Sequence, residues 1–248
     1  MLGLGNSLSS YNVRHYNNWS LDFDGSDDVV NFGNVHNLGD TTDFSISVWF
    51  RRATNSNHYI LGKEQNGDNK WSISTGADES VIFFASTSRT IRIRYVTEAS
   101  VIPDNTTDWN HILVAVDRSN ASNSGMWVNG VGMTLATETE TGIDADLDNT
   151  GDFTIGAVGS NFAEGQITDV SIWNVAITPS GLIALSDLRD GTSGVGNATP
   201  ADLKGKSGLV SWYRMGDGDT YPNVSDYVAS NDGTMEDMTS GDIIQVAP

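Results

Sequence analysis

The sequence predicts an all-β fold of two antiparallel sheets packed face to face, with one short helix after the main series of strands. Short segments alternate apolar and polar residues, as strands with one buried face do. Gly, Asn and Asp turns separate these segments. No pattern of helical length interrupts them before residue 178. Together these three observations favour an antiparallel sandwich over an α/β fold.

The first half of the chain supplies strand candidates at residues 19–23, 29–32, 43–52, 59–63, 70–74, 80–86 and 90–96. Segment 43–52 places four apolar side chains on one face, those of Phe44, Ile46, Val48 and Phe50. Segment 90–96 is two-sided, because Arg92 and Arg94 alternate with apolar residues. Each segment therefore predicts a strand with one face toward a core.

The next strand candidates are residues 109–117, 126–128, 131–135, 152–156 and 166–173. Asn129-Gly130 predicts a tight hairpin between 126–128 and 131–135. Thr178-Pro179 then resembles a helix N-cap followed by a first-turn proline, and Gly191 fits a helix end. The apolar residues between them predict one helix of about three turns. They are Leu182, Ile183, Leu185 and Leu188.

These elements predict one sandwich domain with extensions at both ends. Residues 1–18 form an N-terminal arm, 19–190 the sandwich, and 191–248 a C-terminal extension that begins with a Gly/Ser-rich linker. The extension is too short and too polar for a core of its own. Its one clear strand, residues 209–214, is therefore expected to form an edge strand of the same sandwich.

Composition excludes several classes of protein. The 248 residues include no cysteine, which removes disulfides, thiolate zinc sites and a cysteine nucleophile. The formal net charge of -19 repels nucleic acid and anionic membranes. No stretch approaches the ~20 apolar residues of a membrane-spanning helix, and the N-terminus lacks the pattern of a secretory signal.

Seven segments in order resemble the laminin G-like group of the concanavalin A-like lectin and glucanase superfamily. They read FDGSDDVVNFG, DFSISVWFR, YILGKE, DWNHILVAVD, MWVNGV, FTIGAV and GQITDVSIWNVAIT. The resemblance covers residues 19–190 and implies a two-sheet antiparallel jelly roll. GLVSWYRMGDGD and SNDGTMEDM, which open the domain in many members, here lie at the C-terminus.

That C-terminal arrangement resembles laminin G-like domains of bacteriophage structural proteins. The resemblance implies a non-catalytic module on the virion surface, in a decoration or fibre. It would contact further copies of itself, other virion proteins or glycans, with no nucleic acid or membrane as partner. The alternative is a free, extracellular carbohydrate-binding protein of the lectin type, and a divergent glycosidase is the third reading.

Carboxylates give one candidate metal site. Asp24, Asp27 and Asp28 cluster in one turn. Calcium takes six to eight oxygen ligands, which such a turn supplies in part. Asp169 lies where the resemblance to calcium-binding glucanases implies an aspartate ligand. We therefore expect a structural Ca²⁺ held by these four residues, or else aspartates that only cap a turn.

Aromatic residues are candidates for glycan contact, because sugars pack on exposed rings beside polar groups. Trp71, Tyr95, Trp127 and Tyr221 are the four that we select. The alternative for each is ordinary packing, since large aromatic side chains are mostly buried. Trp49, Trp109 and Trp173 lie in strongly patterned strands and are assigned to the core.

The sequence predicts that the protein is not an enzyme. Glucanases of the superfamily carry a Glu-x-Asp-x-Glu strand, whose paired acids act in retaining hydrolysis. Here the nearest spacing is Glu138-Thr139-Glu140, which lacks the central aspartate. No Gly-x-Ser-x-Gly motif is present either.

Overall fold

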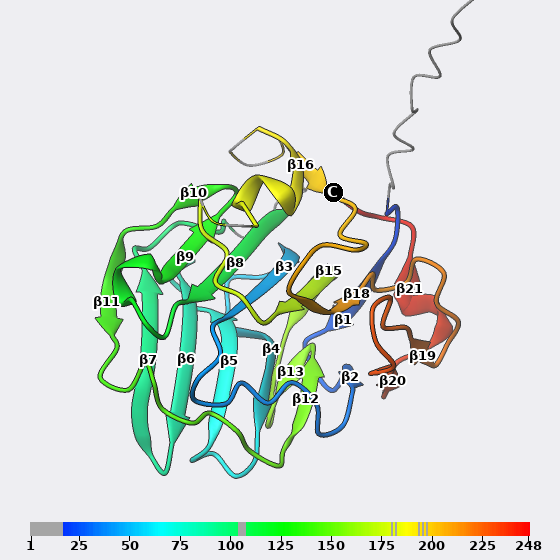
Figure 1. The fold of residues 1–248 in the computed structure, drawn as a ribbon. Coiled ribbons are helices and arrows are strands. Elements are labelled where there is room, and N and C mark those ends of the chain that lie inside the picture. The colour runs from blue at the N-terminus through cyan, green and yellow to red at the C-terminus, as the bar shows by residue number, and fades with distance from the viewer. Residues whose placement is uncertain are drawn as a thin grey trace, which may run out of the picture.

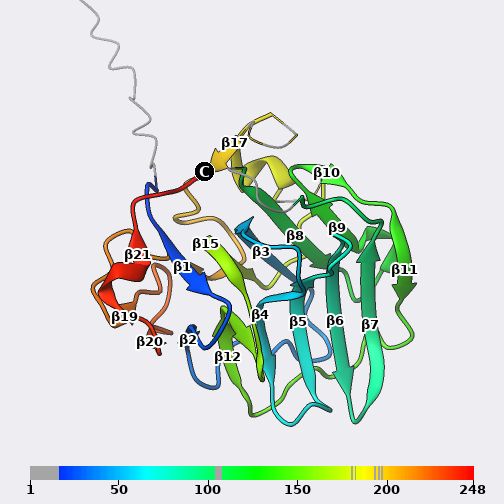
Figure 2. The same cartoon turned by 180° about the vertical axis from the view of Figure 1, so that it is seen from behind.

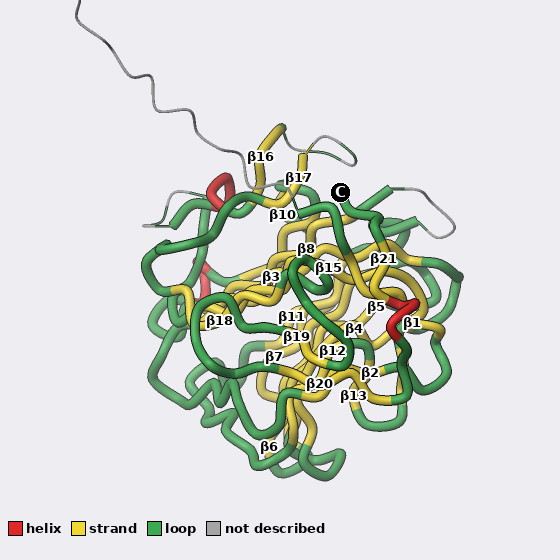
Figure 3. Tube along the Cα trace, turned by 90° about the vertical axis from the view of Figure 1, so that its right-hand side faces the viewer, coloured by secondary structure: helices red, strands yellow, loops and turns green. Residues whose placement is uncertain are grey.

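Two large antiparallel sheets, packed face to face, make up the fold (Figure 1). The computed structural model describes residues 17–103, 108–179, 181, 183–192, 194, 196 and 198–248. Most of the predicted N-terminal arm, residues 1–16, lies outside these. Among the described residues helical structure is limited to three short 3₁₀ turns, Ala121–Asn123, Leu185–Asp187 and Ser240–Asp242 (Figure 3). The all-β jelly-roll prediction is thus confirmed, without a true helix.

Sheet A is the eight-stranded sheet of the described chain. Its order is β10 (Val131–Gly132), β9 (Gly125–Val128), β8 (Asn110–Val116), β3 (Phe44–Arg52), β15 (Glu164–Trp173), β1 (Ser20–Asp24) and β21 (Ile243–Ile244). The eighth strand, β18 (Leu209–Tyr213), also pairs with β15. Strand β15 therefore pairs with β3 along one side and with β1 and then β18 along the other.

Sheet B contains nine strands of the described chain and runs opposite sheet A (Figure 2). Its order is β11 (Leu135–Thr139), β7 (Thr90–Thr97), β6 (Val81–Thr87), β5 (Lys70–Thr75), β4 (His58–Glu64), β12 (Asp152–Ile155), β2 (Val29–Asn31), β20 (Gly233–Glu236) and β19 (Asn223–Val224). Two small ribbons complete the fold. They are β13 (Ala157–Val158) with β14 (Asn161–Phe162), and β16 (Arg189–Gly191) with β17 (Ala198–Pro200).

The main core lies between the sheets, where the inward residues of both alternating patterns meet. Phe44, Ile46, Val48 and Phe50 of β3 are buried there, as the alternation predicts. The Asn129-Gly130 hairpin also forms, with Val128 paired to Val131. Its second strand ends at Gly132, because the following residues cross to sheet B and pair with β7 as β11. The Asn129-Gly130 turn thus predicted the hairpin but not the length of its second strand.

The C-terminal residues return to the N-terminal strands. Strand β18 lies beside β15, strand β20 pairs with β2, and strand β21 pairs with β1 (Figures 1 and 2). The last segment of the chain therefore adds strands to both sheets. Because it pairs with β1 and β2, it covers edges that those strands would otherwise leave open.

The predicted helix after residue 178 is wrong. Thr178 forms a bridge with Ala184, a single 3₁₀ turn follows at Leu185–Asp187, and Gly191 lies in β16; Leu182 is outside the described residues. Ile183, Leu185 and Leu188 instead pack on the outer face of sheet A. A helix this short, with Gly181 inside it, is marginal, so tertiary packing decides the conformation.

This segment gives the molecule a second apolar layer. Trp173 and Trp212 are buried beneath it on the outer face of sheet A, together with Leu113. Trp49 and Trp109 form a smaller cluster with Ala198. The three tryptophans assigned to the core are therefore buried, but outside the sandwich rather than between its sheets. In the described part of the chain, no helix is long and apolar enough to cross a membrane.

Candidate functional site

A polar groove lies at one end of sheet A. Strand β3 begins at Phe44, where β8 ends at Val116 and β15 ends at Trp173, so the flanking loops meet there. Two cavities of about 300 Å³ and about 530 Å³ are found among these loops, and they share Thr42, Asp43 and Asn174. Their size is that of a small-ligand site.

The groove combines an apolar base with exposed polar side chains. Leu38, Phe44 and Trp173 contribute apolar lining. Asn37 and Asn174 are exposed at its margin, and the lining also includes Asp40, Thr42, Asp43, Asp144 and Asp148. Amides and hydroxyls donate and accept hydrogen bonds and carboxylates accept them, which suits a ligand rich in hydroxyl groups. The chemistry fits a neutral polyol better than an anion.

Arg118 holds the two loops that form the walls. Its Nε donates to Thr42 O at 2.9 Å. Its Nη1 donates to Ile143 O and Ala145 O at 2.6 and 2.9 Å, and its Nη2 to Leu38 O and Gly39 O at 2.9 and 2.5 Å. All five guanidinium donors therefore bind backbone carbonyls, from residues 38–42 on one side and 143–145 on the other. The guanidinium also lies 5.4 Å from the centre of the Phe44 ring.

Burying the charged Arg118 guanidinium costs free energy, so its hydrogen bonds to the carbonyls are needed to offset that cost. Arg118 is 8% exposed, and burial lowers the pKa of its guanidinium, although the surrounding aspartates act to raise it. Two of the groove's carboxylates add to the same framework. Asp43 Oδ1 accepts from the Arg118 N–H at 2.9 Å, and Asp148 Oδ1 accepts from the Gly39 N–H at 2.6 Å. The walls are thus preorganised before any ligand binds.

His36 ties the groove to the C-terminal strand β18. Its Nε2 and the Tyr213 hydroxyl are 2.7 Å apart and share a hydrogen bond, and both residues are buried. The pKa of His36 is lowered to about 4, first by burial and also by the charge of Lys63, while the charge of Asp226 acts to raise it. The imidazole is therefore neutral at pH 7 and acts as a packing and hydrogen-bonding group.

Replacing His36 with Gln is expected to reduce the loss of stability in mild acid. The native pKa of about 4 lies below the ordinary value of 6.5, so His36 favours folding fully above pH 6.5 and progressively less as the pH falls toward 4. Between pH 6.5 and pH 4 the free energy of unfolding of wild type should fall by up to about 3 kcal/mol more than that of His36→Gln. Urea unfolding of both proteins at pH 7, 5.5 and 4 measures it. A difference that does not change with pH would contradict this role.

The four selected aromatics do not form one site. Trp71 and Tyr95 are both fully buried between the sheets, so the prediction that they contact glycan is wrong. Trp71 stacks on Phe153 at 5.6 Å, and the Tyr95 hydroxyl bonds to Glu140. Trp127 is half-buried against the outer layer of sheet A, and Tyr221 is 43% exposed near β19. Alternation alone did not tell which face of β5 and β7 is inward.

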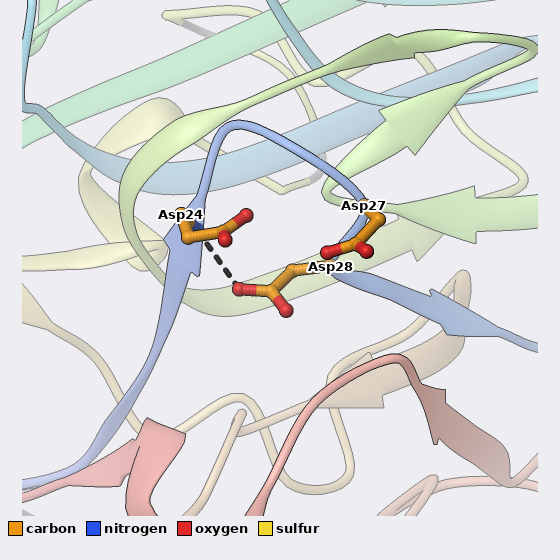
Figure 4. Close-up of side chains that lie close together, drawn as sticks. All are labelled: Asp24, Asp27 and Asp28. Atoms are coloured by element: carbon orange, nitrogen blue, oxygen red, sulfur yellow. Dashed lines mark hydrogen bonds between the residues drawn. The ribbon is translucent and has the colours of Figure 1, made fainter.

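Asp24, Asp27 and Asp28 do lie together at the turn between β1 and β2 (Figure 4). One oxygen of each lies within 4.8 Å of the others. Two of the carboxylates already serve the turn, because Asp28 accepts from the Asp24 N–H at 2.9 Å and Asp24 from the Ser26 N–H at 2.7 Å. The pKa of Asp28 is raised to about 6, first by burial and then by neighbouring carboxylates. The oxygens suit Ca²⁺ in type, and three side chains give part of a shell.

Asp169 does not join that cluster. Asp24 pairs with Glu164, five residues from Asp169 on β15, which places the two aspartates roughly 16 Å apart along the strand. Asp169 is instead buried at a bulge and accepts from Asn17 Nδ2 at 2.7 Å and Trp212 Nε1 at 3.0 Å. Burial raises its pKa to about 6. This carboxylate therefore joins Asn17, which precedes β1, to β18 rather than binding the metal predicted from the sequence.

The groove residues were missed by sequence reasoning, although one signal was available. Asp43 directly precedes strand β3 and Asn174 directly follows strand β15. Polar residues at the ends of neighbouring strands meet at one edge of a sheet. That inference needs the order of the strands, which the sequence alone did not give.

Comparisons with known proteins agree with the two-sheet fold. Residues 24–182 match the family described as the concanavalin A-like lectin/glucanases superfamily. The fold is similar to a putative carbohydrate binding protein from Bacteroides ovatus (TM-score 0.57, 17% identity, 90% of this chain and 59% of that chain). It is also similar to NanB sialidase from Streptococcus pneumoniae (TM-score 0.51, 14% identity, 71% of this chain and 29% of that chain). A further match is to domains LG4-5 of the mouse laminin alpha1 chain (TM-score 0.47, 15% identity, 65% of this chain and 42% of that chain).

The matches to the Bacteroides protein and to the sialidase bear on the fold alone, because the identities are only 17% and 14%. The laminin match, with a TM-score of 0.47, supports no conclusion. The chain spans 59% of the length of the Bacteroides protein and 29% of the sialidase. A search of curated protein sequences gives no match.

Proposed function

The chain belongs to the concanavalin A-like lectin/glucanases superfamily, and we propose that it is a non-catalytic carbohydrate-binding module whose site is the groove at the end of sheet A. The observation that carries the proposal is the pair of walls fixed by Arg118, with Asn37 and Asn174 exposed at the margin of the groove. A preorganised groove with exposed amides binds hydroxyl groups at low entropic cost.

Two of the four aspartates that line the groove are engaged in holding its walls. Asp43 accepts the backbone N–H of Arg118, and Asp148 accepts that of Gly39 in a wall loop, so both have a structural role. Glu138 and Glu140, the nearest approach to a paired-acid strand, belong to β11 and the turn after it, and Glu140 is bonded to Tyr95. Neither pair resembles two free carboxylates facing a sugar ring.

Glycan binding is tested with a panel of immobilised neutral oligosaccharides of glucose, galactose, mannose and N-acetylglucosamine. We expect binding to at least one, weakened about tenfold or more in Asn37→Ala/Asn174→Ala, since each lost hydrogen bond contributes roughly 0.5–1.5 kcal/mol. Gln65→Ala, an exposed amide elsewhere, is the control and should bind as wild type does. Binding to no member of the panel, or equal binding by the double variant, would contradict the proposal.

Two further predictions from the sequence remain to be tested. Structural calcium at the Asp24–Asp28 turn predicts a lower melting temperature in EDTA, and Asp27→Asn should remove that difference. Attachment to a virion predicts that the protein is found in purified particles. Neither is needed for glycan binding in the groove.

A further inference from the structure

A small cavity of about 200 Å³ lies between the β9–β10 turn and the segment around β16 (Figure 1). It shares no residue with the groove. Pro179 and Leu185 contribute apolar lining, Ser186 is exposed, and two glycines take part. The remaining lining residue is Arg189, which begins β16. Among the described residues of the lining, Arg189 therefore carries the single charge.

Arg189 is buried without the partners that a buried guanidinium needs. Its side chain belongs to a residue that is only 5% exposed. Among the described residues it makes one hydrogen bond, from Nη2 to Thr192 O at 3.3 Å, and its Nε has no hydrogen-bond partner. The guanidinium also lies 5.9 Å from the centre of the Trp49 ring. Most of its five N–H donors therefore have no acceptor in the described chain.

The other buried arginines are satisfied in one of two ways. Arg118 donates to five backbone carbonyls, and Arg52 donates to four carbonyls and an amide oxygen. Arg214 forms an ion pair with Asp217. Arg189 has neither arrangement, since no described carboxylate lies within ion-pair distance of it. Burial alone lowers its pKa, whereas aspartates act to raise the pKa of Arg118.

An anion from solution can supply the counter-ion that Arg189 lacks in the described chain. A buried charge without a partner is strongly unfavourable, so the gain on pairing it is large. The chain has 32 acidic residues, and one of them, Asp187, lies two positions before Arg189. Asp187 is already bound to the Lys206 ammonium at 2.7 Å and to the Ala184 N–H at 2.8 Å. A ligand carboxylate would therefore take a place that no described carboxylate holds.

The rest of the lining narrows the class of anion. A volume of about 200 Å³ is below the ~300–1,000 Å³ of sites for drug-sized ligands. A guanidinium binds a carboxylate through two parallel N–H donors, and the Ser186 hydroxyl can donate a third. Pro179 and Leu185 suit a short hydrocarbon chain, whereas they would leave oxygens of a phosphate without donors. These features fit a small molecule with one carboxylate and a short apolar part.

We propose that this cavity binds a short-chain organic monocarboxylate. The carboxylate would accept from the Arg189 guanidinium, and the hydrocarbon part would lie against Pro179 and Leu185. Because the bound anion pairs a buried charge of the folded protein, binding would also raise its stability. The site is separate from the groove and does not rest on the function of the groove.

Sodium butyrate is the probe, compared at equal ionic strength with its uncharged analogue butyramide and with inorganic phosphate. Calorimetry and the side-chain Nε–H signals of nitrogen-15-labelled arginine measure binding to the whole chain. We expect one saturable site for butyrate, with a shift of the Arg189 signal, and binding about tenfold or more weaker for the other two compounds. The melting temperature should rise with the concentration of butyrate.

Two variants test the cavity itself. Arg189→Gln removes the charge, and Ser186→Phe fills the cavity from an exposed position while Arg189 stays in place. Each should bind butyrate about tenfold or more weakly than wild type. The controls are Arg89→Gln, at an arginine side chain that is 83% exposed, and Ser122→Phe, at the exposed middle residue of another 3₁₀ turn. Both controls should stay within about twofold of wild type.

Loss of butyrate binding in both cavity variants, with both controls unchanged, supports the proposal. If Arg189→Gln does not fold, Ser186→Phe and the wild-type signals decide. Equal weakening in Arg189→Gln and Arg89→Gln would show attraction by charge in general and overturn the proposal. Butyramide or phosphate bound as tightly as butyrate would overturn it too, because the site would not select a carboxylate. Failure of wild type to bind butyrate at a saturable site would do the same, whatever the groove binds.

Discussion

Replacing Arg118 with Ala is expected to lower the free energy of unfolding by about 3–5 kcal/mol, because a buried cation and its five carbonyl contacts are lost together. The same change should release the walls of the groove and weaken glycan binding. Arg118→Lys should recover only part of the stability, since an ammonium has three donors in place of a planar fork of five. Urea unfolding measures the stability.

Arg89→Ala is the matched control. Arg89 pairs with Asp68 at 2.9 Å, but its side chain is 83% exposed. Exposed pairs contribute about 0–1 kcal/mol, so this variant should unfold almost as wild type does. Similar losses for Arg118→Ala and Arg89→Ala would show that Arg118 does not hold the loops.

Replacing Trp71 with Ala is expected to lower the free energy of unfolding by about 3–5 kcal/mol, the range for removing a large aromatic side chain from a core. Trp71 is fully buried and stacked on Phe153. Trp71→Phe should cost much less, since it keeps an aromatic ring and removes an indole N–H that has no hydrogen-bond partner among the described residues. Thermal and urea unfolding of the two variants measure this difference.

Glycan affinity separates packing from ligand contact at this position. Folded Trp71→Phe should bind the panel as wild type does. Trp127→Ala removes a half-buried ring from the outer layer and should lower the free energy of unfolding by about 1–2 kcal/mol. It serves as the comparison for an aromatic that is not in the main core. If Trp71→Phe lost glycan binding while its stability was unchanged, Trp71 would have to be a glycan-contacting residue.

Local patterns predicted the fold well because strands with one buried face leave a direct record in the sequence. The alternation in β3 and the Asn129-Gly130 turn are examples, and both appear in the structure. Residues 178–191 carried cap and stripe signals for a helix, but their apolar side chains are used to cover Trp173 and Trp212 instead. Short segments are decided by what they pack against, which the sequence does not state.

The site was less predictable because it depends on contacts between distant residues. Asp169 and Asp24 are both at strand positions that looked adjacent, yet the register of β1 on β15 separates them. Arg118 looked like one arginine after a strand. Its role appears only when two loops, 80 and 25 residues away in sequence, are placed around its guanidinium. Predicting the groove therefore requires the strand order and the register.

The most direct test of the central claim is a crystal structure of the protein with the tightest-binding neutral oligosaccharide from the panel. We predict a sugar ring in the groove, hydrogen-bonded to Asn37 and Asn174, between walls that keep their Arg118 contacts. A sugar bound elsewhere on the molecule, with the groove free of ligand, would contradict the account.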